Sequence, residues 1–237
     1  MSTHPASRPI PLALTMLVSL FSALVALAVA GGHDAAAHGT KQHATGASAA
    51  AVGQPIVTPR TVAFHDQMRK LWEDHVTWTR LAIISLTTNA PDTGATVARL
   101  LKNQADIGDA LKPFYGDKAA ERLTSLLRDH ILIAADLIAA AKAGDQAAVA
   151  QQQARWTANA DQIAGFLAGA NPGSWPLEEM KAMLHEHLRL TTDEVLARLH
   201  ADWDADVAAY DAIHAQALGM ADMLSNGILR QFPGSVH

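Results

Sequence analysis

Four histidines fall near the midpoints of four separate stretches that the sequence predicts to be long helices. They are His75, His130, His187 and His214. Each lies on the stripe of its predicted helix that should face the core, and the midpoints of up-and-down helices fall at about the same height. We therefore expect the four imidazoles to converge in one polar layer inside an apolar core. Buried polar groups must be satisfied, so such a layer is either a metal or cofactor site or a hydrogen-bonded network.

Neutral imidazole is the commonest protein ligand for transition metals, so the four histidines are expected to hold Cu, Zn, Fe or Ni. Non-covalent haem, held by two histidines or by a histidine and a methionine, is the other expected ligand. Asp211 lies three residues before His214 on the same predicted face and could bind the metal or orient an imidazole. Met183 and Met180 precede His187 by one and two turns and would suit soft Cu(I).

Two other classes of function remain open at this stage. The layer could be a structural polar core in an interaction or sensor module without enzymatic activity. Alternatively, Asp211 and His214 could form the catalytic pair of a hydrolase or transferase. Five polar residues on the second and fourth predicted helices could extend the polar interior, although capping, pairing or exposure to water is commoner for such residues: Asn103, Asp106, Lys112, Asn159 and Asp161. The sequence contains no Gly-rich phosphate loop, nucleophile elbow or zinc-protease motif.

Three of these histidines lie in short segments that resemble one another. Residues 73–76, 128–131 and 185–188 each place an acidic residue before the histidine and an aliphatic residue after it. The fourth histidine lacks this pattern. These segments are too short to establish a duplication.

The N-terminal 30 residues read as an export signal. Arg8 gives a weakly positive start, and an apolar run over residues 10–30 ends in the small-residue pattern Ala28-Val29-Ala30. We expect an exported protein, periplasmic or secreted. The run is long for a signal peptide, so an uncleaved membrane anchor is the alternative, and only then would the membrane be a partner.

Residues 31–59 lack hydrophobic periodicity and read as a flexible His-rich linker. If the signal is cleaved after Ala30, the mature chain begins Gly31-Gly32-His33. A free amine, two amide nitrogens and the His33 imidazole form a square-planar nitrogen set that suits Cu(II) or Ni(II). The alternative is that histidine occurs in this polar linker by chance.

Composition excludes several classes of protein. The formal net charge of the 237-residue chain is −5 and no basic stripe is present, so nucleic acid is not expected as a partner. The chain has no cysteine, which excludes disulfides, thiolate metal ligands, lipoprotein attachment and covalent haem. The expected partner is a metal ion or a small ligand, and the sequence leaves the oligomeric state open.

Hydrophobic periodicity predicts an all-α domain over residues 60–233, an up-and-down bundle of about six helices. The first four predicted helices span residues 61–88, 93–115, 117–143 and 145–168, the fifth begins at Pro176, and the sixth runs to about residue 230. The first, third, fifth and sixth carry the histidines. We expect the second and fourth either to pack outside these four or to complete a larger bundle.

Several stretches resemble a group of short bacterial all-helical proteins, across nearly all of residues 65–233. They are Leu71-Trp72-Glu73-Asp74-His75, Trp78-Thr79-Arg80, Arg128-Asp129-His130-Ile131, Ala209-Tyr210-Asp211 and Ala221-Asp222-Met223-Leu224-Ser225. Members of the group carry inconsistent labels, such as glycosyltransferase or acetylglutamate kinase. Both labels imply α/β folds, whereas this sequence shows neither strands nor nucleotide-binding loops. The resemblance therefore implies an all-helical fold and supplies no ligand.

Overall fold

The computed structural model describes residues 58–235, which form six consecutive helices with no strand among them. The helices are α2 (Pro59–Thr88), α3 (Thr93–Tyr115), α4 (Asp117–Ala143), α5 (Gln146–Ala170), α6 (Leu177–Leu199) and α7 (Trp203–Gln231). The predicted all-α bundle is confirmed. The predicted export signal and the linker, including His33, lie outside the described residues. None of the described helices contains an apolar stretch long enough to cross a membrane.

Polar caps and residues with positive φ set the helix ends. The Thr58 hydroxyl accepts a hydrogen bond from the Thr61 amide, 3.1 Å away, at the start of α2. Asp145 caps α5 in the same way, accepting from the Ala148 amide at 3.0 Å. Gly144 ends α4 with a φ of 71°, a conformation that glycine adopts without steric cost. These short connections make successive helices antiparallel neighbours.

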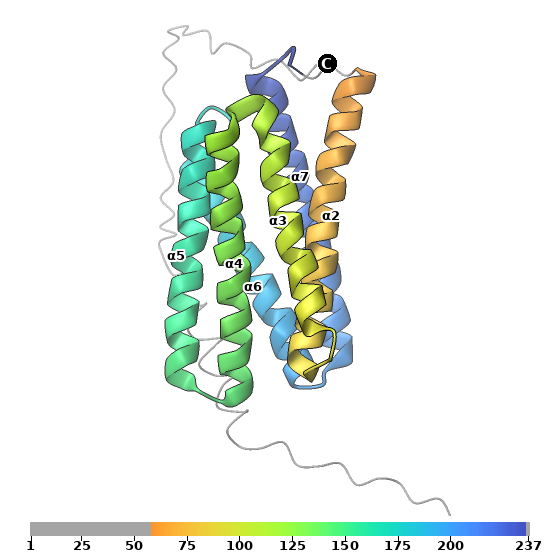
Figure 1. Cartoon of the computed structure of the whole chain (residues 1–237), viewed down its shortest axis with the longest axis vertical. Coiled ribbons are helices and arrows are strands. Elements are labelled where there is room, and N and C mark those ends of the chain that lie inside the picture. Colours follow the sequence, from red (N-terminus) through yellow and green to blue (C-terminus); the bar gives the residue numbers. More distant parts are fainter. Residues whose placement is uncertain (1–57, 236–237) are drawn as a thin grey trace, which may run out of the picture. The chain divides into compact units, whose positions relative to one another are not determined.

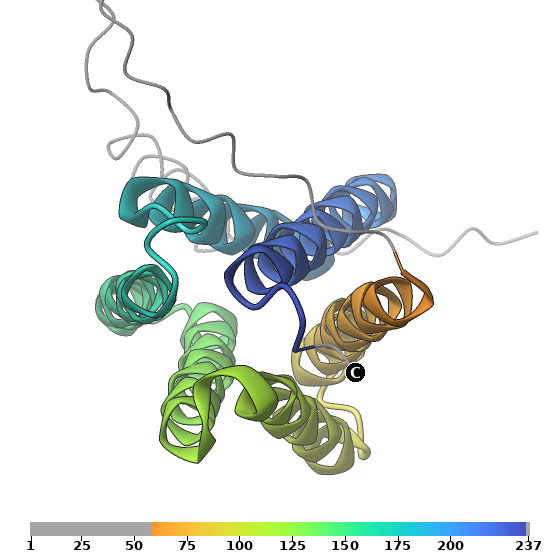
Figure 2. The same ribbon diagram turned by 90° about the horizontal axis from the view of Figure 1, so that it is seen from above.

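The six helices form a closed ring, which Figure 2 shows from above. Each helix packs against the next in the chain, and α7 packs against α2 to close the ring (Figures 1 and 2). The helices α2, α4 and α6 also approach one another across the interior, since α2 makes further contacts with both α4 and α6. Of the two expected roles for α3 and α5, completion of a larger bundle is the one observed.

The ring is equivalent to three consecutive helical hairpins, α2–α3, α4–α5 and α6–α7. The first helix of each hairpin carries one of the histidines that the sequence singled out: His75 on α2, His130 on α4 and His187 on α6. The fold thereby brings three residues that are far apart in the chain to one central region.

Candidate functional site

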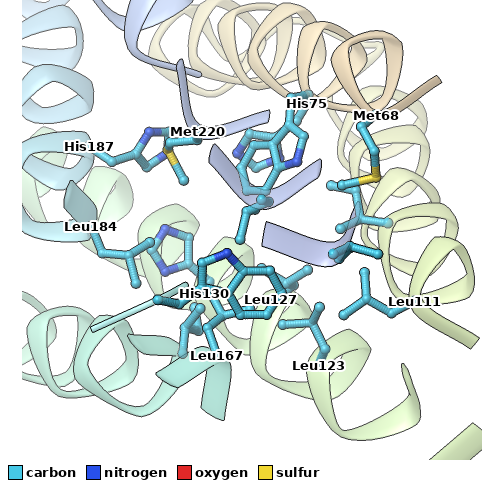
Figure 3. Close-up of a pocket in the computed structure, with 16 residues that line it drawn as sticks. Met68, His75, Leu111, Leu123, Leu127, His130, Leu167, Leu184, His187 and Met220 are labelled. Atoms are coloured by element: carbon cyan, nitrogen blue, oxygen red, sulfur yellow. The ribbon is translucent and has the colours of Figure 1, made fainter. Parts of the chain in front are cut away.

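His75, His130 and His187 meet at a cavity inside the ring (Figure 3). Their exposed fractions are 4%, 5% and 4%. The ring centroid of His187 lies 5.7 Å from that of His75 and 6.2 Å from that of His130. Three of the four histidines expected in the layer are therefore together, one from each hairpin.

The cavity is small, closed and otherwise apolar. It contains about 30 Å³ of space open to the centres of water molecules, room for about two waters at 10–15 Å³ each. Residues from all six helices line it: Met68, Trp72, His75, Ile107, Leu111, Leu123, Leu127, His130, Ile163, Leu167, Trp175, Leu184, His187, Met220, Leu224 and Ile228. The polar side chains among these lining residues are the three imidazoles and the indoles of Trp72 and Trp175, and no carboxylate is among them.

Each imidazole is held at Nδ1 by an amide side chain from the second helix of its own hairpin. Asn159 Oδ1 lies 2.8 Å from His130 Nδ1, and Gln216 Oε1 lies 3.0 Å from His187 Nδ1. These oxygens can only accept, so Nδ1 carries the proton in both histidines and Nε2 has a free lone pair. The hydrogen bonds therefore fix both the tautomer and the orientation of each ring.

The amides are themselves held in place by the helix that carries the histidine. Asn159 Nδ2 donates to the Leu126 carbonyl at 3.0 Å, and Gln216 Nε2 donates to the Met183 carbonyl at 3.1 Å. Leu126 and Met183 each precede their histidine by four residues. Because the amide nitrogen faces a carbonyl, the amide oxygen must face the imidazole.

The first hairpin builds the same support from two amides. Asn103 Nδ2 donates to the Leu71 carbonyl at 2.9 Å, and Leu71 again precedes its histidine by four residues. Gln104 Nε2 lies 3.2 Å from His75 Nδ1 and also donates to the Leu100 carbonyl and to Asn103 Oδ1. The two hydrogens of this amide nitrogen are taken by the Leu100 carbonyl and Asn103 Oδ1, so its contact with Nδ1 does not fix the tautomer of His75. On His130 and His187, Nε2 is the acceptor.

The spacing of these groups shows an internal threefold repeat. His130 follows His75 by 55 residues, and His187 follows His130 by 57. Each histidine lies 29 residues before the amide that contacts its Nδ1. The resemblance among the three short segments is thus part of a repeated unit in which the first helix supplies an imidazole and the second supplies the amide that orients it.

Burial keeps all three imidazoles neutral. Desolvation, followed by the nearby His187 and His130, lowers the pKa of His75 to about 3, against the hydrogen bonds with Asn103 and Gln104, which raise it. Desolvation first, and then His187, lowers the pKa of His130 to about 3. Desolvation also lowers the pKa of His187. At neutral pH each ring therefore keeps one lone pair, and on His130 and His187 this lone pair is on Nε2.

The prediction that His214 joins the layer is wrong in its placement. The His214 side chain is 33% exposed, and its Nε2 lies 3.5 Å from Glu73 Oε1, outside the residues that line the cavity. Asp211 is exposed to solvent. The buried face of α7 instead runs through Ile213 and Ala217, one residue before and three after His214. This face is rotated by about 100° from the predicted one, because one residue of an α-helix turns through that angle.

The methionines that were expected to support the site do not do so. Met180 is buried, but it is not among the residues that line the cavity. Met183 contributes its backbone carbonyl to Gln216, as described above. The thioethers that do reach the cavity are those of Met68 and Met220, which sequence reasoning missed.

A second buried polar cluster lies among α2, α6 and α7, apart from the cavity. Arg80 Nη1 contacts Glu194 Oε1 at 2.8 Å and Asp206 Oδ1 at 2.9 Å, and Arg198 Nη1 contacts Asp206 Oδ2 at 2.9 Å. Glu194 and Asp206 are 1% and 2% exposed. The four charges pair with one another, so this cluster ties three helices together.

The three histidines are close to metal-binding geometry without adopting it. No group of three or more His, Asp or Glu side chains within residues 58–235 is close enough to hold a metal ion as it stands. In a tetrahedral site with nitrogens 2.0–2.1 Å from the metal, imidazole centroids lie about 5 Å apart. The observed 5.7 and 6.2 Å therefore exceed that spacing by about 1 Å.

Comparisons with known family models, curated proteins and solved structures find no match to this chain. They leave the resemblance to short bacterial all-helical proteins as a prediction. The site must be interpreted from its own geometry.

Proposed function

We propose that this protein, exported as its N-terminal sequence predicts, binds a single transition-metal ion through Nε2 of His75, His130 and His187. One observation carries the proposal: three imidazoles, each anchored at Nδ1 by an amide, share one closed cavity. Three neutral nitrogens around a small space are a typical metal-binding set.

The energetic cost of an empty site supports this proposal. Within residues 58–235, the hydrogen bonds of these three rings to protein groups are formed at Nδ1, which leaves each Nε2 to the cavity. A buried polar group without a partner costs about 1–3 kcal/mol. Something in the cavity is therefore expected to satisfy these three nitrogens.

The amide supports are what a metal site requires around its ligands. Histidines that bind metals usually donate their other ring nitrogen to an oxygen, which fixes the ring and raises its basicity. His130 and His187 already do so through Asn159 and Gln216. His75 would carry its proton on Nδ1 when the metal is bound, with Asn103 Oδ1 as the acceptor. The rings would also close in by about 1 Å.

The cavity does not fit haem. The roughly 30 Å³ open to the centres of water molecules holds about two waters, and side chains from all six helices line it, so a porphyrin would have to displace them. Accommodating it would require the ring of helices to open. Of the two kinds of cofactor that the sequence suggested, a metal ion is the one we retain.

A trapped water molecule is the alternative occupant, and it corresponds to a structural polar core without enzymatic activity. The Nε2 acceptors of His130 and His187, with His75 Nε2 as the third partner, match the three hydrogen bonds that a buried water typically makes. The water would need no movement of the rings. An experiment must therefore separate a metal from water in the same cavity.

Metal content measured on untagged full-length protein provides this test. So that the linker histidines cannot bind the added metal, every sample would carry His33→Ala, His38→Ala and His43→Ala. The protein would be refolded with Zn(II) or with Cu(I) under reductant, because a closed cavity admits ions only when the bundle opens. We expect a single tightly bound ion per chain and a higher melting temperature with metal than with chelator.

The decisive variant replaces a ligand and its amide together, His130→Leu with Asn159→Leu. Replacing both partners of a buried hydrogen bond with apolar groups avoids an orphaned acceptor and should preserve the fold. This variant should lose the metal and its stabilisation, while His214→Leu, outside the cavity, should keep both. Equal metal binding by the parent and the double variant would contradict the proposal, as would the absence of tight binding by the parent.

A further inference from the structure

We infer that the Met220 thioether is the fourth ligand and that the site therefore selects a soft monovalent ion, Cu(I). The inference rests on the proposed function, because it names the metal held by the same three histidines. Figure 3 shows Met220 together with His75, His130 and His187 around the cavity. The sequence suggested Met180 and Met183 as the thioethers for Cu(I), whereas the residue that lines the cavity beside the histidines is Met220.

Comparison of the three hairpins shows that Met220 differs in chemistry from the residues at the equivalent positions. In each hairpin, one amide donates to the carbonyl four residues before the histidine, and the residue four positions after that amide lines the cavity, one turn away on the same face of the second helix. In the first hairpin this amide is Asn103, the neighbour of Gln104. These equivalent residues are Ile107 after Asn103, Ile163 after Asn159, and Met220 after Gln216. Two are hydrocarbon and one carries sulfur. The threefold arrangement of nitrogens is thus broken at a single position, by an atom that can bind a soft metal.

The other methionine of the cavity is less well placed. Met68 precedes His75 by seven residues, which corresponds to about 10 Å along the helix axis. Its equivalent on α4 is Leu123, which also lines the cavity. Met68 therefore occupies an apolar layer two turns from the histidines, and it provides a matched control for Met220.

The electrostatics of the cavity favour a single positive charge. The residues that line it include neutral histidines and no carboxylate, so nothing in the wall compensates the charge of a bound ion. The cost of burying an ion rises with the square of its charge, so a divalent ion pays about four times the desolvation cost of a monovalent one. Zn(II) usually offsets this cost with an anionic ligand or a bound water, whereas imidazole and thioether together suit Cu(I).

The test compares Met220→Ile with Met68→Leu in the full chain, with His33, His38 and His43 replaced by alanine throughout. Each substitution installs the aliphatic side chain found at an equivalent position of the repeat, or a close analogue of it, so packing should be preserved. The proteins would be refolded anaerobically with Cu(I) and ascorbate, or with Zn(II). Affinity would be measured by competition with a chromophoric chelator specific for each ion.

We expect the parent to have a lower dissociation constant for Cu(I) than for Zn(II). Met220→Ile should weaken Cu(I) binding by at least the 10–100-fold typical of losing a supporting group around a metal, and should leave Zn(II) binding unchanged. Met68→Leu should bind Cu(I) as the parent does. Trp72 and Trp156 lie 5.6 Å from His75 and 5.2 Å from His130, between ring centroids, so tryptophan fluorescence gives a second readout of occupancy.

Three results would overturn the inference, and only the last of them also overturns the proposed function. If Met220→Ile binds Cu(I) as tightly as the parent, or if the parent prefers Zn(II), the three histidines still hold a metal but Met220 does not select it. If the parent binds neither ion in the cavity, the proposed function fails and the inference fails with it.

Discussion

Acid should destabilise the metal-free protein through its buried histidines, and the size of the effect follows from their burial. The folded-state pKa values of His75 and His130 are lowered to about 3, from about 6.5 in the unfolded chain. Below pH 6.5 these histidines therefore bind protons in the unfolded state but remain neutral in the folded state. The stability contributed by each neutral histidine is fully present above pH 6.5 and declines as the pH falls from there towards about 3.

The magnitude between pH 7.5 and 5 depends little on the exact folded-state pKa. As long as that pKa stays below 5, each histidine loses about 1.36 kcal/mol per pH unit over about 1.5 units, or about 2 kcal/mol. His75 and His130 together should cost about 4 kcal/mol. The lowered pKa of His187 acts in the same direction.

Glu194 works against this trend and has to be separated from it. Burial raises its pKa to about 7, even though Arg80 lies 2.8 Å away and lowers it. The folded protein then takes up a proton between pH 7 and the unfolded value of 4.5, which stabilises the fold as the pH falls. The pH profile of the parent alone therefore mixes two opposite contributions.

A difference measurement isolates the histidine. Urea unfolding, followed by circular dichroism in the presence of a chelator, would compare the parent with the double variant His130→Leu/Asn159→Leu at pH 7.5, 6.5, 5.5 and 5. Glu194 is common to both proteins and cancels. We expect the parent to lose about 2 kcal/mol more than the variant over this range, and His214→Leu to behave as the parent does. Losses that agree within about 0.5 kcal/mol would refute a buried neutral His130.

Three further substitutions test the packing and the buried charges of the bundle, and each is checked by the midpoint of urea unfolding. Gly227→Ala should destabilise the fold by about 1–3 kcal/mol, because a Cβ there would lie 2.2 Å from Trp175 Nε1. Gly219→Ala, with nothing within 4 Å of the added Cβ, should stabilise α7 by about 0.5–1 kcal/mol. If the two substitutions have the same effect, the close approach of Trp175 is not real. Asp206→Asn should cost about 1.5–3 kcal/mol, because it weakens two charged hydrogen bonds to Arg80 at 2.9 and 3.0 Å. An unchanged midpoint would contradict that role.

Helix boundaries were predictable wherever a strong terminator was present. The predicted helices 93–115 and 117–143 match α3 and α4, because Gly116 and Gly144 separate them from their neighbours. The predicted helix 145–168 ends two residues too early, since α5 continues to Ala170 before Asn171. Gly169, which follows the predicted end, lies inside the helix and does not terminate it. The helix ends where Asn171-Pro172 makes continuation unfavourable.

The face of α7 was harder to predict, because alanines surround it. The predicted face carried Asp211 and His214, but Asp211 is exposed, His214 is 33% exposed, and the buried positions include Ile213 and Ala217. Alanine is small and apolar on every side of such a helix, so the contrast between faces is low and the sequence leaves the rotation of the helix undetermined. Only the contacts of α7 with α6 and α2 select the face that is buried.

The amides that orient the histidines could not be identified from one helix at a time. Asn159 was recognised as a possible extension of the polar interior, whereas Gln216 was overlooked. Each lies 29 residues after its histidine, on the next helix, so the relationship appears only when the helices are paired into hairpins. The constant spacing is the signal that could have revealed it. A search for repeats that included polar residues on alternate helices would have aligned the two pairs.

A ring of six helices explains why this protein has a polar centre at all. Two packed helices leave no space between them, whereas six around an axis enclose one that large side chains fill incompletely. Three equivalent hairpins place equivalent residues around that axis, so a polar residue at one position becomes a ring of polar groups. In this chain the ring consists of imidazoles, and each hairpin also supplies the amide that holds its own imidazole. If packing alone had been required, leucine at these positions would have filled the cavity without buried polar groups that need partners. The histidines, their amides and the single sulfur of Met220 are therefore the residues to test for a bound ion.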